Sequence, residues 1–422
     1  MLKNIKASII TIGTELLIGQ TIDTNSAWIG QELNKIGIWV KRRVAVADDY
    51  NDICTALDEE SKHADIILIT GGLGPTADDI TKPLLCKYFG GKMIVDKNVL
   101  QHITQLFQKY NRPLLERNLK QAEVPDVCTV IPNPLGTAPG MWFIKNKKIF
   151  ISMPGVPYEM KGMMIDTISP KLSQQCTLPI ITHKTLVTID IAESVLAERI
   201  QDFENNLPAN IQLAYLPNHS MVRLRLTAIG ENKIHVYNEL DTQFNKLKKQ
   251  VQDVMIADED LSIQEIIGKI LMDKKATVAT AESCTGGYIA HLITSIAGSS
   301  AYYKGSVISY ANEIKQSMLN VSQHNLDTFG AVSEQVVTKM VKGVLQNMHT
   351  DYAIATSGIM GPTGGTAEKP VGFVWIAVGD QHKIVSKSFQ CRFDRLKNIE
   401  LTAMNALNLL RKFVMNEFDS RA

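Results

Sequence analysis

One stretch of this chain brings the side chains needed for hydrolysis close together in sequence. It contains Ala281-Glu-Ser-Cys-Thr-Gly-Gly287, Gly298-Ser-Ser300 and Tyr310-Ala-Asn-Glu-Ile-Lys315. A serine can act as a nucleophile, a lysine of lowered pKa can act as a base, and a tyrosine can relay a proton. The combination indicates a hydrolytic site that takes an anionic substrate.

The glycine-rich turn within this stretch lies between two predicted elements. The run 276–281 has the composition of a strand, and the run 288–296 has the apolar spacing of a helix. A turn of small residues before a helix predicts an anion site, because free backbone N–H groups and the helix dipole face the ligand. The open alternative is that Ser283 only caps the helix and the glycines only form a tight turn.

Acidic residues follow the predicted strands near the start of the chain. They are Glu15 after the strand 7–12, Asp48 and Asp49 after the strand 39–46, and Asp78 and Asp79 after the strand 65–70. Carboxylates gathered at one edge of a sheet can bind a divalent cation, which then holds a diphosphate. The pattern therefore predicts a metal-dependent site at this edge.

A second glycine-rich turn precedes Asp79. Its glycines, Gly71, Gly72 and Gly74, would let backbone N–H groups approach phosphate oxygens closely. A single Asp in such a place is most simply a helix cap or a solvated turn residue. The whole unit Gly-Gly-x-Gly-Pro-Thr-x-Asp-Asp-x-Thr, which includes Thr76, instead favours a phosphate-binding loop.

The predicted elements place the chain in the α/β class and divide it into three parts. Residues 1–170 alternate strands and helices, which implies a parallel sheet with helices on both faces and ligands at the carboxyl ends of the strands. Residues 171–256 predict a small α+β module that starts with a helix over 190–203. Residues 257–422 return to alternation, with strands predicted at 276–281, 306–310, 352–356 and 371–378.

Composition argues against several classes of protein. The 422 residues carry a net charge of +1 with Lys and Arg scattered, which disfavours a nucleic-acid or membrane-surface partner. No run approaches the ~20 apolar residues of a membrane span, and the apolar run after Met1 is too short for a signal peptide. The six cysteines stand alone without metal-ligand spacing, so we expect reduced thiols in a cytoplasmic protein.

Several motifs of the first part resemble the CinA family of competence/damage-inducible proteins. They are Ile12-Gly-Thr-Glu-Leu-Leu-Ile-Gly19, Asp23-Thr-Asn25, Gly71-Gly-Leu-Gly-Pro-Thr-Ala-Asp-Asp-Ile-Thr81, Asn133-Pro-Leu-Gly-Thr-Ala-Pro-Gly140 and Met153-Pro-Gly-Val-Pro-Tyr-Glu-Met160. The resemblance implies a fold similar to the molybdopterin-binding domain of MogA and MoaB proteins. The implied activity is metal-dependent hydrolysis of ADP-ribose to AMP and ribose 5-phosphate.

The resemblance also implies which residues hold the cation. Asp48 and Asp79 match the acidic positions of MogA-like proteins, and Glu15 and Asp78 are added because they lie near the motif. The implied cofactor is a divalent metal ion, cobalt or magnesium, with potassium as a further candidate. Which carboxylate binds the metal and which orients water stays open.

The middle part resembles the KH-like module of full-length CinA proteins. KH domains that bind nucleic acid use a G-x-x-G loop, and between Ile181 and Met255 the sequence has a single glycine, Gly230. We therefore interpret this module as a spacer or a dimerisation element. Asp190-Ile-Ala192 stands where the family usually carries glycine.

The last part resembles nicotinamide-nucleotide amidohydrolase (PncC), which forms the C-terminal domain of CinA proteins. The matching motifs are Ala281 to Gly287, Ala297-Gly-Ser-Ser300, Ser309-Tyr-Ala-Asn-Glu-Ile-Lys315, Gly330-Ala-Val-Ser-Glu334, Ser357-Gly-Ile-Met-Gly-Pro362 and Lys369-Pro-Val-Gly372. The implied reaction converts nicotinamide mononucleotide to nicotinate mononucleotide and ammonia, without a cofactor.

This second resemblance implies residue roles as well. Ser300 matches the family nucleophile and Lys315 its general base, and Tyr310 would relay a proton or orient the pair. The other implied site residues are Ser283, Thr285, Gly286 and Gly287 for substrate or oxyanion contacts, and Ser357, Gly358 and Arg395 for ribose or phosphate. Phe393 stands where the family usually has the glycine before Asp-Arg.

Several alternatives stay open from the sequence. Lys315 could be a surface lysine, and Ser300 could be a helix cap. Cys284 is intrinsically a stronger nucleophile, but no histidine has an obvious place beside it. The chain could also be a nucleotide- or pterin-binding protein with one or both sites inactive, or a non-enzymatic competence or DNA-uptake partner. The resemblance implies a homodimer.

Overall fold

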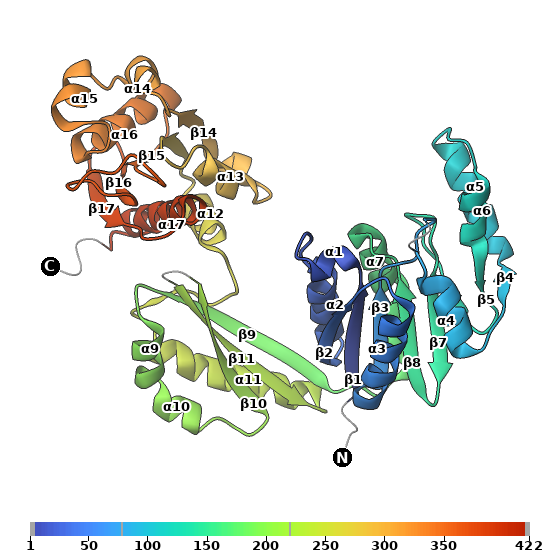
Figure 1. Ribbon diagram of the computed structural model, residues 1–422. Coiled ribbons are helices and arrows are strands. Elements are labelled where there is room, and N and C mark those ends of the chain that lie inside the picture. Colours follow the sequence, from blue (N-terminus) through green and yellow to red (C-terminus); the bar gives the residue numbers. More distant parts are fainter. Residues whose placement is uncertain (1–4, 77–78, 219–220, 418–422) are drawn as a thin grey trace. The chain divides into compact units, whose positions relative to one another are not determined.

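The computed structural model describes residues 5–76, 79–218 and 221–417, and the chain divides into two compact units. The first unit consists of Met1–His183, Phe203–Leu213 and Leu226–Lys246, and the second consists of Lys184–Asp202, Ala214–Arg225 and Leu247–Ala422. Both contain helices and strands (Figure 1). The mixed α/β fold class predicted from the sequence is confirmed.

A mixed sheet forms the centre of the first unit. Its strands, in the order in which they lie side by side, are β2 (Trp39–Val46), β1 (Lys6–Ile12), β3 (Ile66–Thr70), β8 (Lys148–Met153), β7 (Gly140–Lys145) and β6 (Thr129–Ile131). β2, β1, β3 and β8 are parallel, whereas β7 and β6 add an antiparallel edge. The chain leaves β1 toward β2 on one side while β3 lies on the other, so β1 and β3 flank a switch point, the place where open α/β sheets bind their ligands.

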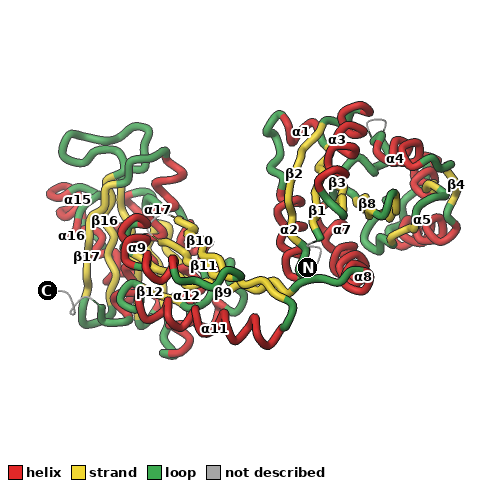
Figure 2. Tube along the Cα trace, turned by 90° about the horizontal axis from the view of Figure 1, so that it is seen from below, coloured by secondary structure: helices red, strands yellow, loops and turns green. Residues whose placement is uncertain are grey.

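Helices cover both faces of this sheet (Figure 2). α2 (Thr24–Lys35), α7 (Pro157–Met163) and α8 (Ser169–Gln175) cover one face, and α3 (Tyr50–His63) and α4 (Thr81–Phe89) cover the other. α1 (Thr14–Leu17) follows β1, whereas α5 (Lys97–Lys109) and α6 (Glu116–Leu119) pack against residues Lys120–Ala122. Alternation along β1 directs Ile9 toward Leu33 of α2 and Ile10 toward Leu57 of α3, which gives one core on each face. Short elements complete the unit: a 3-10 helix (Lys120–Ala122), a π-helical turn (Met164–Ile168), and β4 (Met93–Val95) paired with β5 (Glu123–Pro125).

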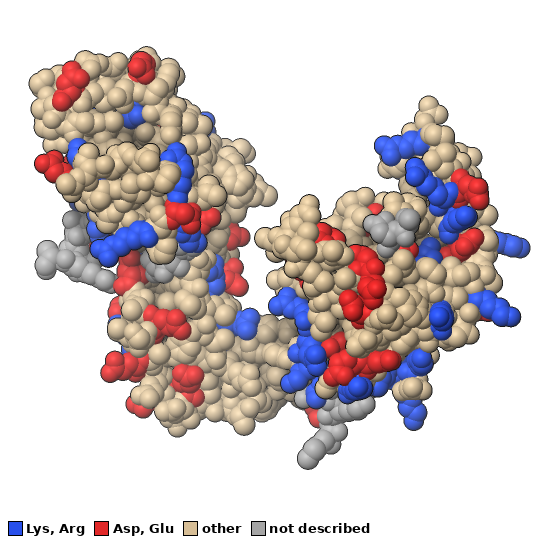
Figure 3. All heavy atoms as spheres, in the orientation of Figure 1, with Lys and Arg blue, Asp and Glu red and all other residues tan. Residues whose placement is uncertain are grey.

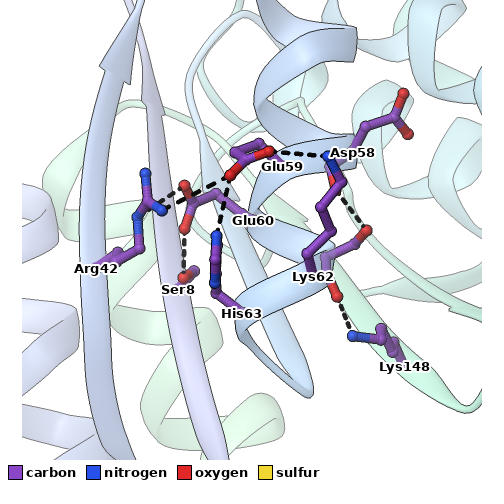
Figure 4. Close-up of polar contacts among 9 residues, drawn as sticks. Ser8, Arg42, Asp58, Glu59, Glu60, Lys62, His63 and Lys148 are labelled. Atoms are coloured by element: carbon purple, nitrogen blue, oxygen red, sulfur yellow. Dashed lines mark hydrogen bonds and ion pairs between the residues drawn. The ribbon is translucent and has the colours of Figure 1, made fainter.

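A polar cluster fixes α3 against the edge of the sheet (Figure 4). Glu60 is 1% exposed; its carboxylate accepts a hydrogen bond of 2.6 Å from the Ser8 hydroxyl and pairs with Arg42 Nε at 3.1 Å. On the exposed side, a hydrogen bond from His63 helps to lower the pKa of Glu59 to about 2. A buried carboxylate needs such partners, because burying it unpaired would be costly.

The middle segment contains an antiparallel sheet and a long helix. The elements are β9 (Ile180–Ile189), α9 (Glu193–Arg199), α10 (Gln201–Asn205), β10 (Ile211–Asn218), β11 (Met221–Gly230), α11 (Lys233–Gln250) and β12 (Met255–Ala257), with strand order β10-β11-β9-β12. The prediction of one helix over 190–203 is wrong. Asp190 follows β9 with a left-handed φ of 59°, and Ile200 separates α9 from α10.

The second unit contains another mixed sheet. Its strands, in spatial order, are β14 (Tyr303–Ile308), β13 (Val278–Glu282), β15 (Tyr352–Gly358), β16 (Phe373–Gly379) and β17 (Ile384–Gln390). β14, β13 and β15 are parallel, and β16 and β17 are antiparallel. The predicted strand at 306–310 starts earlier and ends at Ile308, so Ser309 and Tyr310 follow the strand. β13 and β15 flank the switch point of this sheet.

Helices also cover both faces of the second sheet (Figure 1). They are α12 (Ile263–Asp273), α13 (Tyr288–Thr294), a 3-10 helix (Ser299–Ala301), α14 (Asn312–Leu319), α15 (Gln323–Phe329), α16 (Glu334–Met348) and α17 (Arg395–Val414). Val278 of β13 packs toward Leu407 of α17, whereas the neighbouring Ala279 packs toward Val341 of α16. This alternation fixes β13 at the centre of the sheet, with its carboxyl end at the switch point.

Two further features of the structure are the distribution of charge on its surface and the length of its apolar helices. Lys and Arg lie among Asp and Glu over the face drawn in Figure 3. No helix within the described part of the chain combines the length and the apolar composition needed to cross a membrane.

Candidate functional site

Polar side chains of the second unit gather where β13, β14 and β15 end. Because these strands are parallel, the residues that follow them share one edge of the sheet. Ser283 follows β13, Tyr310 follows β14, and Ser357 lies at the end of β15. The structure thus brings several of the sequence-predicted residues to the switch point of the sheet.

Lys315 lies on α14 and points into the protein. Its side chain is 1% exposed, and its Nζ donates hydrogen bonds to the carbonyl oxygens of Ser309 at 2.8 Å and Tyr310 at 3.2 Å. Burial lowers the pKa of this amine because it disfavours the charged form. The alternative that Lys315 is a surface lysine is therefore wrong, and the amine has the environment that a general base needs.

The turn after β13 is organised by Glu282, a carboxylate that the sequence interpretation had not singled out. Glu282 is fully buried and accepts hydrogen bonds from the Thr285 hydroxyl at 2.7 Å and from the backbone N–H groups of Gly287, Ile289 and Ala290 at 3.1, 3.0 and 2.8 Å. The predicted anion site at the start of α13 is consequently filled by the chain's own carboxylate. These three N–H groups are therefore not free to bind a substrate anion.

Most of the other polar groups and glycines of this turn also have a structural role. Thr285 is buried, and its hydroxyl is within 2.9 Å of the Thr356 hydroxyl as well as bonded to Glu282. Gly286 and Gly287 have left-handed φ angles of 59° and 96°, which explains why glycine occupies both places. The Ser283 hydroxyl makes no hydrogen bond within the described residues, so Ser283 provides the free hydroxyl of the turn.

Cys284, the alternative nucleophile, lies in the same turn. It is buried, and burial raises the pKa of its thiol to about 12. A thiol with that pKa stays protonated at neutral pH, whereas the thiolate is the reactive form. Cys284 is therefore a packing residue in this site.

Arg395 and Tyr310 form the rim of the site. Arg395 is the first residue of α17, and its guanidinium donates to the Tyr310 hydroxyl at 3.1 Å and to the Gly361 carbonyl at 2.8 Å. Tyr310 is 64% exposed, so the pair remains accessible to a substrate. The two contacts hold the cation in place without neutralising it, which suits the binding of an anionic group.

Ser357 and Gly358 are used inside the sheet. Ser357 is 1% exposed, and its hydroxyl donates to the carbonyl oxygen of Ala331 at 2.7 Å. Gly358 pairs with Val374 across β15 and β16, and a Cβ at this glycine would lie 2.8 Å from the Val374 side chain. Both residues position the end of β15, and the Ser357 hydroxyl is not free for ribose.

Ser300 is separated from Lys315 within the chain. Ser300 is exposed in the 3-10 helix before β14, whereas Lys315 follows the far end of that strand. A strand of this length spans ~20 Å. The structure therefore does not bring the predicted nucleophile and the predicted base together in one copy of the chain.

In the first unit, the glycine-rich loop lies beside β1, as predicted for a ligand at the switch point. Gly71 and Gly72 have left-handed φ angles of 117° and 65°, and a Cβ at Gly71 would collide with the Ile12 carbonyl. Asp79 braces the loop: its carboxylate accepts from Gly74 N at 2.8 Å, from Thr76 N at 2.9 Å and from the Thr76 hydroxyl. The loop backbone is thus held at the carboxyl end of β3.

The predicted metal ligands have separate local roles. Asp48 accepts a hydrogen bond from Thr14 N at 2.9 Å, Asp49 caps the start of α3, and Glu15 is exposed on α1. Asp78 lies outside the described residues. Across the described residues, no group of three or more His, Cys, Asp or Glu side chains is close enough to hold a metal ion.

Lys82 is a second residue that the sequence interpretation missed. It is 6% exposed near the start of α4, its Nζ donates to the Gln121 carbonyl at 2.9 Å, and burial lowers its pKa to about 8. Its position directly after the Thr81 of the glycine-loop motif was the available signal. For Glu282, the signal was an acidic residue at the end of an otherwise apolar strand, before a glycine turn.

Comparison with known proteins shows the class to which this architecture corresponds. Residues 8–174 match the probable molybdopterin binding domain, residues 183–256 match the damage-inducible protein CinA KH domain, and residues 260–414 match the CinA C-terminal domain. The chain is 45% identical to a CinA-like protein of Flavobacterium psychrophilum, over 98% of this chain and 99% of that protein. It is 44% identical to a CinA-like protein of Cytophaga hutchinsonii, over 97% and 98%. The chain belongs to the CinA family.

A solved structure is similar to part of the chain. The competence/damage inducible protein CihA from Agrobacterium tumefaciens is 38% identical, and the match covers 35% of this chain and 92% of that one with a TM-score of 0.35.

Proposed function

We propose that the second unit hydrolyses the carboxamide of nicotinamide mononucleotide to nicotinate mononucleotide and ammonia. The observation that carries the proposal is the buried amine of Lys315 at the carboxyl ends of parallel strands, where its pKa is lowered. Membership of the CinA family and the resemblance of motifs such as Ser309 to Lys315 to nicotinamide-nucleotide amidohydrolase support the same reaction.

The proposed chemistry needs one base and one hydroxyl. The neutral Lys315 amine removes the proton of the serine hydroxyl, and the serine oxygen attacks the carboxamide carbon. The tetrahedral intermediate expels ammonia, which takes its proton from the Lys315 ammonium. Water, deprotonated by the same amine, then cleaves the acyl-serine ester and leaves nicotinate mononucleotide and the free serine. The resemblance assigns the serine as Ser300.

Arg395 is proposed to bind the substrate phosphate. Its guanidinium is fixed by Tyr310 and Gly361 at the rim and is exposed to solvent. An arginine presents several N–H donors to phosphate oxygens in a rigid fork, so it would also orient the nicotinamide end toward Lys315.

Product analysis tests this proposal. Purified protein incubated with nicotinamide mononucleotide should release ammonia and nicotinate mononucleotide in equal amounts. Nicotinamide, which lacks the phosphate and the ribose, should react far more slowly because it makes no contact with Arg395. If the folded protein releases no ammonia, the proposal fails.

For the first unit, we propose that the glycine-rich loop binds the diphosphate of ADP-ribose for hydrolysis to AMP and ribose 5-phosphate. The supporting observation is the loop braced by Asp79 beside β1 and β3. The described carboxylates do not gather into a metal cage, so the need for cobalt or magnesium stays a prediction from the resemblance. The test is AMP formation with each cation and with a chelator. ADP-ribose that binds without turnover under all conditions would instead favour a binding protein.

A further inference from the structure

We infer that the hydrolytic site is completed between two copies of the chain, where Ser300 of one copy reaches the Lys315 of the other. This inference rests on the proposed amide hydrolysis with Ser300 as its nucleophile. It starts from the placement of the two residues at opposite ends of β14. A base must come within about 3 Å of the hydroxyl that it deprotonates.

Movement within one chain cannot join the two residues. β14 pairs with β13 along its whole length, from Tyr303 opposite Val278 to Ile308 opposite Glu282. β13 is in turn paired with β15 on its other side. Shortening the ~20 Å between the strand ends would require breaking this central part of the sheet. A second copy can supply Ser300 without any such change.

The edge position of β14 makes this arrangement geometrically simple. Within the described residues, β14 has β13 as its one neighbouring strand, so its other side is open to a second molecule. A twofold axis that runs perpendicular to an edge strand, beside its midpoint, places the start of each copy's strand next to the end of the other's. The Ser300 end of each copy then lies at the Lys315 end of the other, and the same symmetric contact completes both sites.

The surface around the Lys315 end has the character of such a contact. Ile308, Tyr310, Ile314 and Met318 are 51%, 64%, 38% and 48% exposed. The helix α14 turns Lys315 inward, which leaves Ile314 and Met318, spaced four residues apart, on its outer side. Exposed apolar side chains beside a polar site commonly mark an interface.

Two further features indicate how this contact is made and which molecule makes it. Lys304 and the register shift at the start of β14 disfavour a continuous ladder between two edge strands, so the contact is made by side chains and loops. The exposed loop before β14 carries Gly298 and Ser299 besides Ser300, and such small residues permit close approach. A second copy fits this place because it brings Ser300, the serine that the resemblance assigns as the nucleophile, to the Lys315 end.

A heterodimer with one defect in each copy tests the inference. Ser300→Ala and Lys315→Met chains carrying different affinity tags are co-expressed, and the mixed dimer is isolated by both tags in sequence. Each single variant should be inactive in ammonia release. The mixed dimer should recover about half of the wild-type activity, because one of its two sites contains both intact residues. Ser388→Ala and Lys342→Met, which make the same kinds of change at exposed positions of β17 and α16, serve as matched controls and should keep wild-type activity.

The other outcomes separate this inference from the proposed function. If the wild-type protein releases no ammonia, both the inference and the proposed function fail. An active wild type with an inactive mixed dimer, or with no isolable dimer, overturns the shared site and leaves the reaction within one chain. Retained activity in Ser300→Ala overturns it too, and loss of activity in Ser283→Ala would then identify Ser283 as the serine beside Lys315.

A surface variant gives an independent measurement. Ile314→Glu combined with Met318→Glu places charges on two exposed positions of α14, so the fold should persist. The variant should sediment as a monomer and lose at least about tenfold of its ammonia release. Ile144→Glu, at a 68% exposed apolar position elsewhere, is the control. A monomeric double variant with full activity would contradict the inference.

Discussion

At the scale of single residues, the proposed reaction depends on the protonation state of Lys315. The amine acts as a base only when neutral, and burial lowers its pKa from the ordinary value of 10.5. We predict that kcat/KM for nicotinamide mononucleotide rises with pH as Lys315 loses its proton and then reaches a plateau. The measurement is the pH–rate profile of the wild-type protein.

The matched variant for this prediction is Lys315→Arg. Arginine retains a positive charge but has a pKa above ~12, so it stays protonated and should give no activity at any accessible pH. A wild-type profile that does not rise with pH, or an active Lys315→Arg protein, would contradict the role of Lys315 as a base.

Some features of these residues could be predicted from the sequence, and others could not. Ser283 follows the predicted strand 276–281, whereas Tyr310 lay inside the predicted strand 306–310 and follows a strand only in the structure. Burial of Lys315 could not be predicted, since lysine is mostly exposed and α14 is short. The direction of the Glu282 side chain was equally hidden, and that direction decides whether the start of α13 is open to a ligand.

At the scale of elements, the turn between β13 and α13 depends on Glu282. Glu282→Gln would put an amide N–H₂ among groups that all donate hydrogen bonds, so at least one buried group would lose its partner. We expect the unfolding free energy to fall by roughly 2–4 kcal/mol, measured by urea denaturation. Because the same turn carries Ser283, ammonia release should fall as well.

The control for this change is Glu313→Gln, which makes the same substitution on an exposed residue of α14. It should leave the unfolding free energy within about 0.5 kcal/mol of the wild type. A Glu282→Gln protein as stable as the Glu313→Gln protein would mean that the carboxylate does not hold the turn.

The observed bounds of β14 separate Ser300 and Lys315, which the sequence analysis assigned to one site. The first half of the strand has no apolar pattern, because residues 304–306 are polar or small. The predicted strand therefore began only at residue 306. The pairing of Ser300 with Lys315 as nucleophile and base came from the family resemblance, which carries no information on the distance between them. The structure starts β14 at Tyr303, which inserts a whole strand between them.

The middle segment was also predicted incompletely. β9 and β10 have no strict alternation of apolar and polar residues, since β9 contains Thr182, His183 and Lys184 in succession. β11, which alternates, was predicted near its observed position. Apolar strands such as β1 and β3 were predicted well, because both of their faces are buried under helices.

At the scale of the whole molecule, the two proposed reactions depend on residues in different compact units. Asp79 lies in the first unit and Lys315 in the second. We predict that Asp79→Ala loses ADP-ribose hydrolysis, because Gly74 and Thr76 lose their shared acceptor, and that it retains ammonia release. Both activities are measured on the same preparation of each variant.

Measuring both activities in each variant distinguishes the loss of one catalytic site from the loss of the fold. Lys315→Met should show the opposite pattern, with AMP formation kept and ammonia release lost. If either substitution removes both activities while the protein remains folded, the two sites do not work independently. Loss of both activities together with a lower melting temperature would indicate damage to the fold instead.

The most direct test of the central claim compares ammonia release from nicotinamide mononucleotide by the wild-type protein and by Lys315→Met. We predict a loss of at least ~100-fold, the lower range for removing a general base, with a melting temperature that is unchanged or higher. Methionine fills a similar volume without burying an amine, so it should not unfold the site. A folded Lys315→Met protein that releases ammonia at the wild-type rate would contradict the claim that this buried amine performs the hydrolysis.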